Sequence, residues 1–408
     1  MDKIVKKSCL EALKKPGPPI IIATLPEEAE AIYYACKDNG INVTAFCDNE
    51  LRRVEKKYCG LKVIHTPELN KYYPEARIII AFFDLDETSN QLSKLGYKEF
   101  YSPLELLDNY DMNKHKHRHT QTYIESKISI SKKSHRMYFD ETKTYLRSLD
   151  IMITTKCSMK CKSCANLMQY YVDAKNTDEG ILSYVKTLSE NVDAISEFRV
   201  IGGEPLMNKH WAKIVNGVIE QDNKREVFIY TNGTIAPKDD DLKSFEGKEV
   251  NFYITNYGKL SKNVDRMVES LEKHGIAYMN KPADYWVDCA TIREHKRPPK
   301  DNKIVFEECC AKHFYTLLNG KLYTCPFIAN AANLKAIPLT NSDFVDLTDT
   351  NQDLRGKISK LVNMRNFFPA CDFCVGRPYD PTTAEVYDGK GFIKAAEQAA
   401  SPIEFKKY

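Results

Sequence analysis

Cysteine spacing is the feature of this sequence that points most directly to chemistry. Cys157, Cys161 and Cys164 are separated by three and then two residues. Cysteine thiolates are preferred ligands of iron–sulfur clusters, and they also build structural zinc sites. Three thiolates bound to a cube of four irons leave one iron without a protein ligand. The spacing by itself is compatible with a cluster that has one open iron, with half of a zinc site and with three unrelated buried cysteines.

A second group of cysteines occupies the C-terminal part of the chain: Cys309, Cys310, Cys325, Cys371 and Cys374. The dipeptide Asn319-Gly320 separates two β-rich runs and predicts a hairpin that returns the third of these cysteines to the first two. A helix expected over 353–366 leads to the last two. Four of these sulfurs fit a closed iron–sulfur cluster that carries electrons, and a zinc ribbon is the alternative.

The elements around the first cysteine group alternate between strand and helix. Strands are expected over 149–154, 197–201, 226–230, 250–254 and 276–280, and helices over 177–192, 209–221, 238–246 and 262–274. This order predicts an α/β fold, an open, partial β/α barrel over about 148–290. Such a barrel carries its ligand-binding groups at the C-terminal ends of its strands.

Polar residues fall at these strand ends: Gly202, Gly203, Glu204, Thr231, Asn232, Thr255 and Asn256. The two glycines permit a close approach of the backbone to a ligand. The threonine–asparagine pairs are equally compatible with ligand contacts and with ordinary turn and cap hydrogen bonds.

The segment after the last barrel strand, Tyr285 to Cys289, is expected to face the open barrel mouth. Trp286 suits stacking on a sugar ring or covering the core. Asp288 is a candidate general base. Cys289 is a candidate thiol hydrogen donor, and a small buried hydrophobe is its alternative interpretation.

The first 110 residues form a separate pattern. Strands expected over 18–24, 41–48, 60–64 and 76–83 alternate with a helix over 27–39 that ends at Gly40, which predicts a small Rossmann-like parallel sheet. The turn after the first strand has no glycine, so a dinucleotide is not expected there. Asp48 is interpreted as a solvated strand-end carboxylate or a ribose contact. The cysteines of this region are interpreted as packing residues: Cys9, Cys36, Cys47 and Cys59.

Two further segments, 111–147 and 386–408, are expected to lack chemistry of their own. Residues 111–147 are interpreted as a solvated basic connector; if they formed a strand, His115, His117 and His119 would lie on one face as a weak metal clamp. Residues 386–408 are expected to form a helical tail that packs back on the barrel. The region between the barrel and this tail, 291–385, is assigned to the domain that holds the second cysteine group.

Composition places the protein among ordinary globular chains. Its 408 residues allow two or three domains, and 43% of them are hydrophobic and 28% charged. A net charge of +3 does not indicate nucleic-acid binding, which usually needs a strongly basic surface. No apolar run is long enough to span a bilayer. The start of the chain has no hydrophobic signal core, and thirteen cysteines in such a chain favour metal over disulfides. We therefore expect the protein to be located in a reducing cytoplasm.

The cysteine spacing, together with the Gly202-Gly-Glu-Pro205 turn, resembles the radical S-adenosylmethionine (SAM) enzymes. The resemblance covers about 148–375. It implies a 4Fe–4S cluster on Cys157, Cys161 and Cys164, whose open iron binds SAM and whose reduction yields a 5′-deoxyadenosyl radical. It also implies that the polar strand ends contact SAM. The residue before the third cysteine is often aromatic in this family and here is Ser163.

The second cysteine group resembles the auxiliary-cluster domains called SPASM and Twitch, most of all the shorter Twitch form. That form closes with one Cys-x-x-Cys and implies a second 4Fe–4S cluster with four cysteine ligands. The loop length favours Cys310 over Cys309 as the first ligand, and the choice stays open. The whole arrangement resembles radical SAM dehydrogenases of the butirosin aminocyclitol type, and the N-terminal region resembles domains attached to polysaccharide-biosynthesis enzymes.

These resemblances imply an enzyme that abstracts hydrogen from a carbinol carbon of a sugar, polyol or nucleotide-linked sugar and oxidises it. Epimerisation of a sugar is the first alternative, modification of a peptide or protein side chain the second, and a zinc-binding scaffold without activity the third. The implied partners are a small carbohydrate substrate and an electron donor of the flavodoxin or ferredoxin type.

Overall fold

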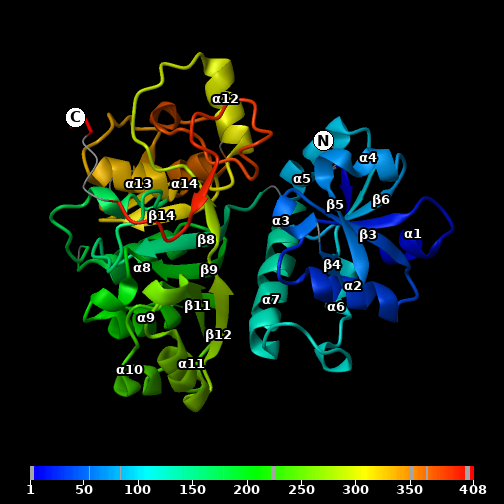
Figure 1. The fold of residues 1–408 in the computed structure, drawn as a ribbon, viewed down its shortest axis with the longest axis horizontal. Coiled ribbons are helices and arrows are strands. Elements are labelled where there is room, and N and C mark those ends of the chain that lie inside the picture. The colour runs from blue at the N-terminus through cyan, green and yellow to red at the C-terminus, as the bar shows by residue number, and fades with distance from the viewer. Residues whose placement is uncertain are drawn as a thin grey trace. The chain divides into compact units, whose positions relative to one another are not determined.

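The computed structural model describes residues 4–54, 56–82, 84–140, 142–177, 179–221, 226–349, 353–363, 366–399 and 405–408. The chain divides into two compact units, Met1–Lys143 and Thr144–Tyr408. Figure 1 shows that strands and helices are mixed in both. In the described part of the chain, no helix has the length and apolarity needed to cross a membrane.

The first unit is built on a seven-stranded sheet of order β1-β7-β6-β2-β3-β5-β4. Its strands are β1 (Val5–Lys6), β2 (Ile20–Ala23), β3 (Val43–Asp48), β4 (Lys57–Tyr58), β5 (Leu61–His65), β6 (Arg77–Ile80) and β7 (Glu99–Tyr101). Its helices are α1 (Leu10–Lys14), α2 (Ala29–Asp38), α3 (Leu51–Val54), α4 (Leu69–Tyr72), α5 (Leu85–Lys94), α6 (Leu104–Asp108) and α7 (Gln121–Tyr138). All pairings are parallel except β4 with β5, as alternating strands and helices predict.

The turn after β2 is closed by Asp48 at the end of β3. This carboxylate is buried and accepts hydrogen bonds from the backbone N–H groups of Leu25, at 2.8 Å, and Glu50, at 2.7 Å. Arg53 pairs with it at 3.1 Å. The interpretation of Asp48 as a solvated carboxylate is therefore wrong. It binds a backbone N–H group of the turn after β2, and in nucleotide-binding folds the N–H groups of this turn face the ligand. Three of the region's cysteines, Cys9, Cys36 and Cys47, are buried as packing residues.

The segment expected to be a solvated connector is largely part of the first unit, which corrects that prediction. Helix α7 buries one face, and its His135 accepts or donates hydrogen bonds with Ser102 Oγ at 2.9 Å and the Phe82 carbonyl at 2.9 Å. His115 stacks on Tyr34 with ring centroids 4.3 Å apart. The buried face of α7 mixes apolar residues with serine, lysine and histidine, so its hydrophobic periodicity in the sequence is weak.

The alternating histidines form no metal clamp. His115 pairs with Asp38 at 2.9 Å, and His117 contacts Tyr110 at 2.8 Å and Glu30 at 3.6 Å. Across the described residues, no three or more His, Cys, Asp or Glu side chains are arranged to hold a single metal ion. The sulfurs that hold a cluster bind different irons, so they need not converge on one point.

The second unit contains an eight-stranded sheet of order β12-β11-β10-β9-β8-β14-β15-β16. Its strands are β8 (Tyr145–Met152), β9 (Ala194–Ile201), β10 (Glu226–Thr231), β11 (Val250–Asn256), β12 (Ala277–Pro282), β14 (Tyr315–Leu318), β15 (Lys321–Tyr323) and β16 (Phe344–Asp346). Helices α8 (Ile181–Glu190), α9 (Trp211–Ile219), α10 (Asp239–Lys243) and α11 (Val264–Lys273) lie along one side of it. The run β8 to β12 is parallel, as predicted for an open barrel, and it does not close.

The predicted hairpin extends this same sheet. Strand β14 pairs in parallel with β8, and β15 pairs antiparallel with both β14 and β16. Asn319 and Gly320 form the turn with φ of 49° and 77°, as the Asn-Gly pair predicts. The hairpin thereby lies directly beside the strand that leads to Cys157. Three further helices complete the unit: α12 (Pro299–Glu308), α13 (Pro326–Asn333) and α14 (Leu354–Val362).

The C-terminal segment is not helical where it is described, which corrects the expected helical tail. Strand β17 (Phe392–Lys394) pairs antiparallel with β13 (Tyr285–Val287). Gln398 then forms an isolated bridge with Cys161. The alanine-rich composition of 395–400 predicts a helix locally, but long-range pairing decides the backbone conformation.

Candidate active site

The first cysteine group lies in the loop that leaves the C-terminal end of β8. Cys161 is buried, and Cys157 and Cys164 are half-buried. Cys157 Sγ accepts from the backbone N–H of Met159 at 3.5 Å and from Asn232 Nδ2 at 3.8 Å. Burial raises the pKa of Cys157 to about 12 and that of Cys161 to about 11. Binding of a metal would therefore release the thiol protons, and the three sulfur donors with their N–H contacts fit a cluster.

The two glycines at the end of β9 are needed for packing against this loop. A Cβ on Gly203 would lie 2.2 Å from the Lys156 carbonyl oxygen and 2.6 Å from Cys157 Cβ. A Cβ on Gly202 would lie 2.5 Å from the Thr154 carbonyl oxygen. The close approach inferred from sequence thus exists, and the neighbour that requires it is the cysteine loop itself.

Glu204 is a buried clamp between two strand ends. It is fully buried and accepts hydrogen bonds from Thr231 Oγ1 at 2.9 Å and from the Asn232 N–H at 2.8 Å. It also accepts from the N–H of Leu206 at 3.2 Å. Burial raises the pKa of Glu204 to about 7. Its carboxylate therefore fixes the position of β10 relative to β9 beside the cysteine loop.

The polar residues at the ends of β10 and β11 are largely engaged in turn hydrogen bonds. Thr231 Oγ1 accepts from the Gly233 N–H at 3.2 Å, and Asn232 Oδ1 accepts from the Thr234 N–H at 3.0 Å. Asn256 Oδ1 accepts from the Gly258 N–H at 2.9 Å. Thr255 is half-buried on β11. Asn232 also contacts the cysteine loop, because its Nδ2 donates to Ser158 Oγ at 3.1 Å and to Cys157 Sγ at 3.8 Å.

Tyr257, which the sequence interpretation missed, follows directly after β11. Burial and the nearby charges of Cys161, Cys164 and Cys157 raise the pKa of its hydroxyl. Its ring meets Trp286 edge-on, with centroids 5.6 Å apart. Trp286 therefore covers an aromatic neighbour of the cysteine loop. A tyrosine next to the Thr255-Asn256 strand end is the one local signal for it.

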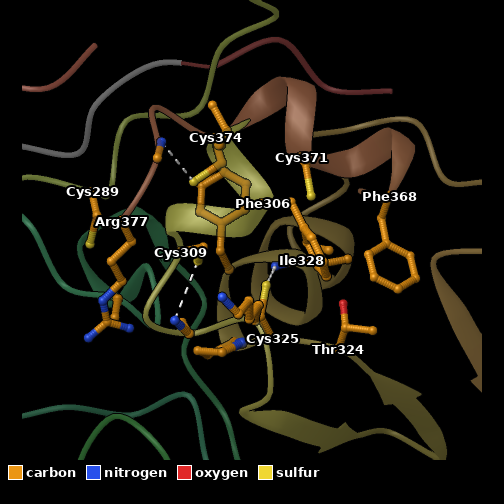
Figure 2. Close-up of a pocket in the computed structure, with 17 residues that line it drawn as sticks. Cys289, Phe306, Cys309, Thr324, Cys325, Ile328, Phe368, Cys371, Cys374 and Arg377 are labelled. Carbon is orange, nitrogen blue, oxygen red and sulfur yellow. Dashed lines mark hydrogen bonds between the residues drawn. The ribbon is translucent and has the colours of Figure 1, made fainter. Parts of the chain in front are cut away.

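The second cysteine group lines a pocket (Figure 2). Its lining includes four cysteines of this group from three segments: Cys309 after α12, Cys325 before α13, and Cys371 and Cys374 at a short 3-10 helix, Pro369–Phe373. Burial raises the pKa of each of these four thiols. Cys309 belongs to the lining and Cys310 does not, in contrast to the loop-length preference for Cys310.

The first cysteine loop contributes to the wall of the second pocket. Ala165, the residue after Cys164, lines the second pocket. Cys289 lines it too and is buried, and Figure 2 shows it beside Arg377. Burial raises the pKa of Cys289 to about 11, while the Arg377 guanidinium opposes that rise. Cys289 therefore faces the second pocket, and the expectation of a thiol at the open barrel mouth is not met.

Asp288 is engaged on both carboxylate oxygens. Ser163 Oγ donates to Oδ1 at 2.8 Å, and the Lys390 N–H donates to Oδ2 at 3.1 Å. The same Ser163 Oγ accepts from the Cys289 N–H at 2.7 Å. The serine that replaces the family's aromatic residue thus ties the first cysteine loop to the wall of the second pocket. Asp288 holds this link together.

The sheet face opposite the helices carries a charged group that the sequence interpretation did not single out. Leu149 and Ile151 of β8 belong to the apolar core, and Asp150 between them points the other way. Its carboxylate lies 2.9 Å from Arg199 Nε, and the guanidinium lies over the rings of Tyr230 and Phe314. Burial raises the pKa of Asp150 to about 6. A lone acid inside an apolar strand was the signal in the sequence.

Comparison with known proteins agrees with the cysteine chemistry. Residues 151–280 match the model of the radical SAM superfamily. GTP 3′,8-cyclase of Clostridium acetobutylicum is 30% identical over 134 residues, which cover 30% of this chain and 41% of that protein. GTP 3′,8-cyclase of Syntrophomonas wolfei is 25% identical over 151 residues, covering 33% and 45%. The chain thus spans less than half the length of these curated relatives.

Two solved structures are also similar to this chain. Native anSMEcpe with bound AdoMet is 12% identical, with 62% of this chain and 93% of that chain covered and a TM-score of 0.39. BtrN in complex with AdoMet and 2-DOIA is 15% identical, with 59% and 97% covered and a TM-score of 0.38. The family match on 151–280 contains Cys157, Cys161 and Cys164 and the strand ends around them, and it implies a 4Fe–4S cluster and SAM. Residues 151–280 of this protein thus form a region that matches the radical SAM superfamily.

Proposed function

We propose that this protein is a radical SAM oxidoreductase that oxidises a carbinol carbon of a sugar, polyol or nucleotide-linked sugar. When bound, the cluster on Cys157, Cys161 and Cys164 and SAM supply a carbon radical that abstracts hydrogen. The observation that carries the oxidase assignment is the second pocket, in which four cysteines can hold an auxiliary 4Fe–4S cluster. A cluster with four protein ligands is suited to accept the electron that an oxidation leaves behind.

The short path between the two cysteine groups supports this role. Ala165 lies in the wall of the second pocket and next to Cys164. Ser163 hydrogen-bonds the segment that contains Cys289, at 2.7 Å to its N–H. The loop that holds the first cysteine group therefore directly contacts the wall of the second pocket, which would favour electron transfer between the two proposed clusters.

The position of Cys289 favours oxidation over epimerisation. An epimerase must return a hydrogen atom to the substrate, for which Cys289 was the thiol candidate. Its side chain is buried in the wall of the second pocket. A thiol held there is 5% exposed and faces the proposed cluster, which does not suit a hydrogen donor to a substrate.

A base must also take the hydroxyl proton of the substrate. Asp288 is occupied by two hydrogen bonds, one to each oxygen. Asp288 is half-buried and would give up one of these bonds to act as the base. Asp150 is less suited, because it is 1% exposed and paired with Arg199 at 2.9 Å.

A second function is favoured by the curated relatives. Both are named GTP 3′,8-cyclase, a name that describes a ring closure on a nucleotide. In this alternative, a nucleotide is the substrate and its rearrangement leaves no ketone. An electron donor of the flavodoxin or ferredoxin type is proposed for either reaction.

The test begins with iron content after anaerobic reconstitution. Two 4Fe–4S clusters give about eight irons per chain. The Cys157→Ala/Cys161→Ala/Cys164→Ala variant should keep about half of them and form no 5′-deoxyadenosine. Cys309→Ala should lose more of the remaining iron than Cys310→Ala, because Cys309 lines the pocket. Reductive SAM cleavage by the triple variant would overturn the proposal, and zinc in place of the second set of irons would remove its electron acceptor.

The substrate is then identified from products. Nucleotide-linked sugars, aminocyclitols, GTP and a peptide library are each incubated with SAM and reductant in deuterated water. A ketone formed with 5′-deoxyadenosine confirms the oxidase. Solvent deuterium at an inverted carbon indicates an epimerase, an isomer of GTP indicates a cyclase, and a modified peptide indicates a maturase; each of these three outcomes contradicts the oxidase.

A further inference from the structure

The C-terminal segment returns to the first cysteine loop, far from it in the sequence. After β17 pairs with β13, the chain continues to Gln398, which forms an isolated β-bridge with Cys161. The Lys162 N–H donates to the Glu397 carbonyl at 2.9 Å, and the Ala399 N–H donates to the Lys160 carbonyl at 2.6 Å. We call residues 392–399 the C-terminal strap. It is held at both ends by backbone hydrogen bonds.

One side chain of the strap contacts a cysteine sulfur directly. Gln398 Nε2 donates to Cys161 Sγ at 3.5 Å and to the Ala396 carbonyl at 3.0 Å. Gln398 Oε1 accepts from the Lys160 N–H at 2.6 Å. The amide is thus oriented from both ends, with its donor facing the sulfur. Gln398 itself is exposed, whereas Cys161 has only 7% of its surface exposed, so the amide forms the outer cover of that sulfur.

We propose that Gln398 is a positioning residue of the radical cluster, which donates a hydrogen bond to the ligand Cys161 and shields it from solvent. This inference rests on the proposed cluster on Cys157, Cys161 and Cys164. Hydrogen bonds to the sulfurs and solvent exposure are two of the levers that set the reduction potential of an iron–sulfur cluster. A donor to Cys161 withdraws electron density from the sulfur and so makes the cluster easier to reduce.

The strap also offers a matched control at the adjacent residue. The Glu397 carboxylate forms an ion pair with Lys162 on the surface. Glu397→Gln removes that ion pair and keeps the backbone pairing and the Gln398 amide. Gln398→Met is neutral and of similar length, so it removes the donor to Cys161 and the acceptor for Lys160 without changing the charge.

The experiment measures the midpoint potential of the radical cluster by redox titration followed by electron paramagnetic resonance. A background with Cys309→Ala and Cys325→Ala removes the signal of the second site. Gln398→Met should shift the potential to a more negative value, and Glu397→Gln should shift it in the opposite direction or leave it unchanged. Gln398→Asn keeps the amide on a shorter side chain and should resemble Gln398→Met.

Amide hydrogen exchange in the protein without cluster provides a readout independent of loading. The Lys160 N–H should exchange faster in Gln398→Met, because its acceptor is lost, and the Lys162 N–H should keep its protection. Equal potentials in wild type and Gln398→Met, both with full clusters, would overturn the role of Gln398. Failure of the wild type to assemble any cluster on the first cysteine group would instead overturn the proposed function.

Discussion

Two residues beside the first cysteine loop support the site, Glu204 through its protonation and Gly203 through its small size. Glu204 joins β9 to β10, and Gly203 allows the loop to approach β9. Neither residue needs to touch a substrate to matter for the site. Both make predictions that separate a scaffold role from a ligand-binding role.

Glu204 should make the stability of the protein fall as the pH rises. Burial raises its pKa from 4.5 to about 7, so the folded state binds more protons than the unfolded state between these values. Its contribution is present below pH 4.5 and is lost as the pH rises through 7, up to about 3 kcal/mol. Thermal unfolding without cluster at pH 5 and pH 8 should show a smaller difference for Glu204→Gln than for wild type. An equal difference in both proteins would contradict this account.

Gly203→Ala should disrupt the first cysteine loop. The added Cβ would lie 2.2 Å from the Lys156 carbonyl oxygen, which is backbone and cannot rotate away. We expect a loss of about 2–4 kcal/mol in the free energy of unfolding and a large loss of iron from the first group. Gly275→Ala is the control: it has a φ of 65° and no atom within 4 Å of the new Cβ. It should cost about 1 kcal/mol and leave the iron content intact, and a similar iron loss in both variants would argue against a specific contact.

At the scale of elements, α7 shows that a polar helix can belong to a core. It packs through His135, which is fully buried and bonded to Ser102 and to the Phe82 carbonyl. Burial favours the neutral imidazole, and the hydrogen bond to the Phe82 carbonyl opposes this effect only in part. The segment that precedes α7, with its alternating histidines, adds contacts such as the stacking of His115 on Tyr34.

His135 should make the first unit sensitive to acid. Burial lowers its pKa from 6.5 to about 4, so the unfolded state binds more protons between these values. The stabilisation is present above pH 6.5 and is lost as the pH falls through 4, about 3 kcal/mol in all. Hydrogen exchange of residues 4–140 at pH 7 and pH 4.5 should show this loss in wild type and a smaller one in His135→Gln. His115→Gln, at a half-buried position before α7, should keep the wild-type acid sensitivity. Acid sensitivity that survives in His135→Gln would contradict the assignment.

At the scale of the whole molecule, the two compact units should respond differently to metal. Both cysteine groups lie in Thr144–Tyr408, and a ligand that binds only the folded state stabilises the unit that holds it. Reconstitution should therefore increase amide protection in residues 144–399 and leave residues 4–140 unchanged. In the Cys157→Ala/Cys161→Ala/Cys164→Ala variant, the increase in amide protection should be limited to the residues around the second cysteine group. An equal gain in the first unit would show that the units unfold together.

The sequence by itself determined the α/β class, the order of the barrel strands, the Asn319-Gly320 hairpin and the two cysteine groups. These features depend on spacing over a few residues, which local backbone preferences and hydrophobic periodicity encode. The turn dipeptide, for example, specifies its own left-handed backbone. Such features can be predicted without knowing what packs against them.

Only the tertiary structure decided which residues complete the sites. It placed Cys309 in the second pocket in preference to Cys310, although the two are adjacent in sequence. It also engaged Asp288 with Ser163, and it brought Gln398 to Cys161 across 237 residues. Strand and side-chain pairings between distant segments are selected by the packing of the whole unit. No local pattern encodes them, which is why the alanine-rich tail became a strap where a helix was expected.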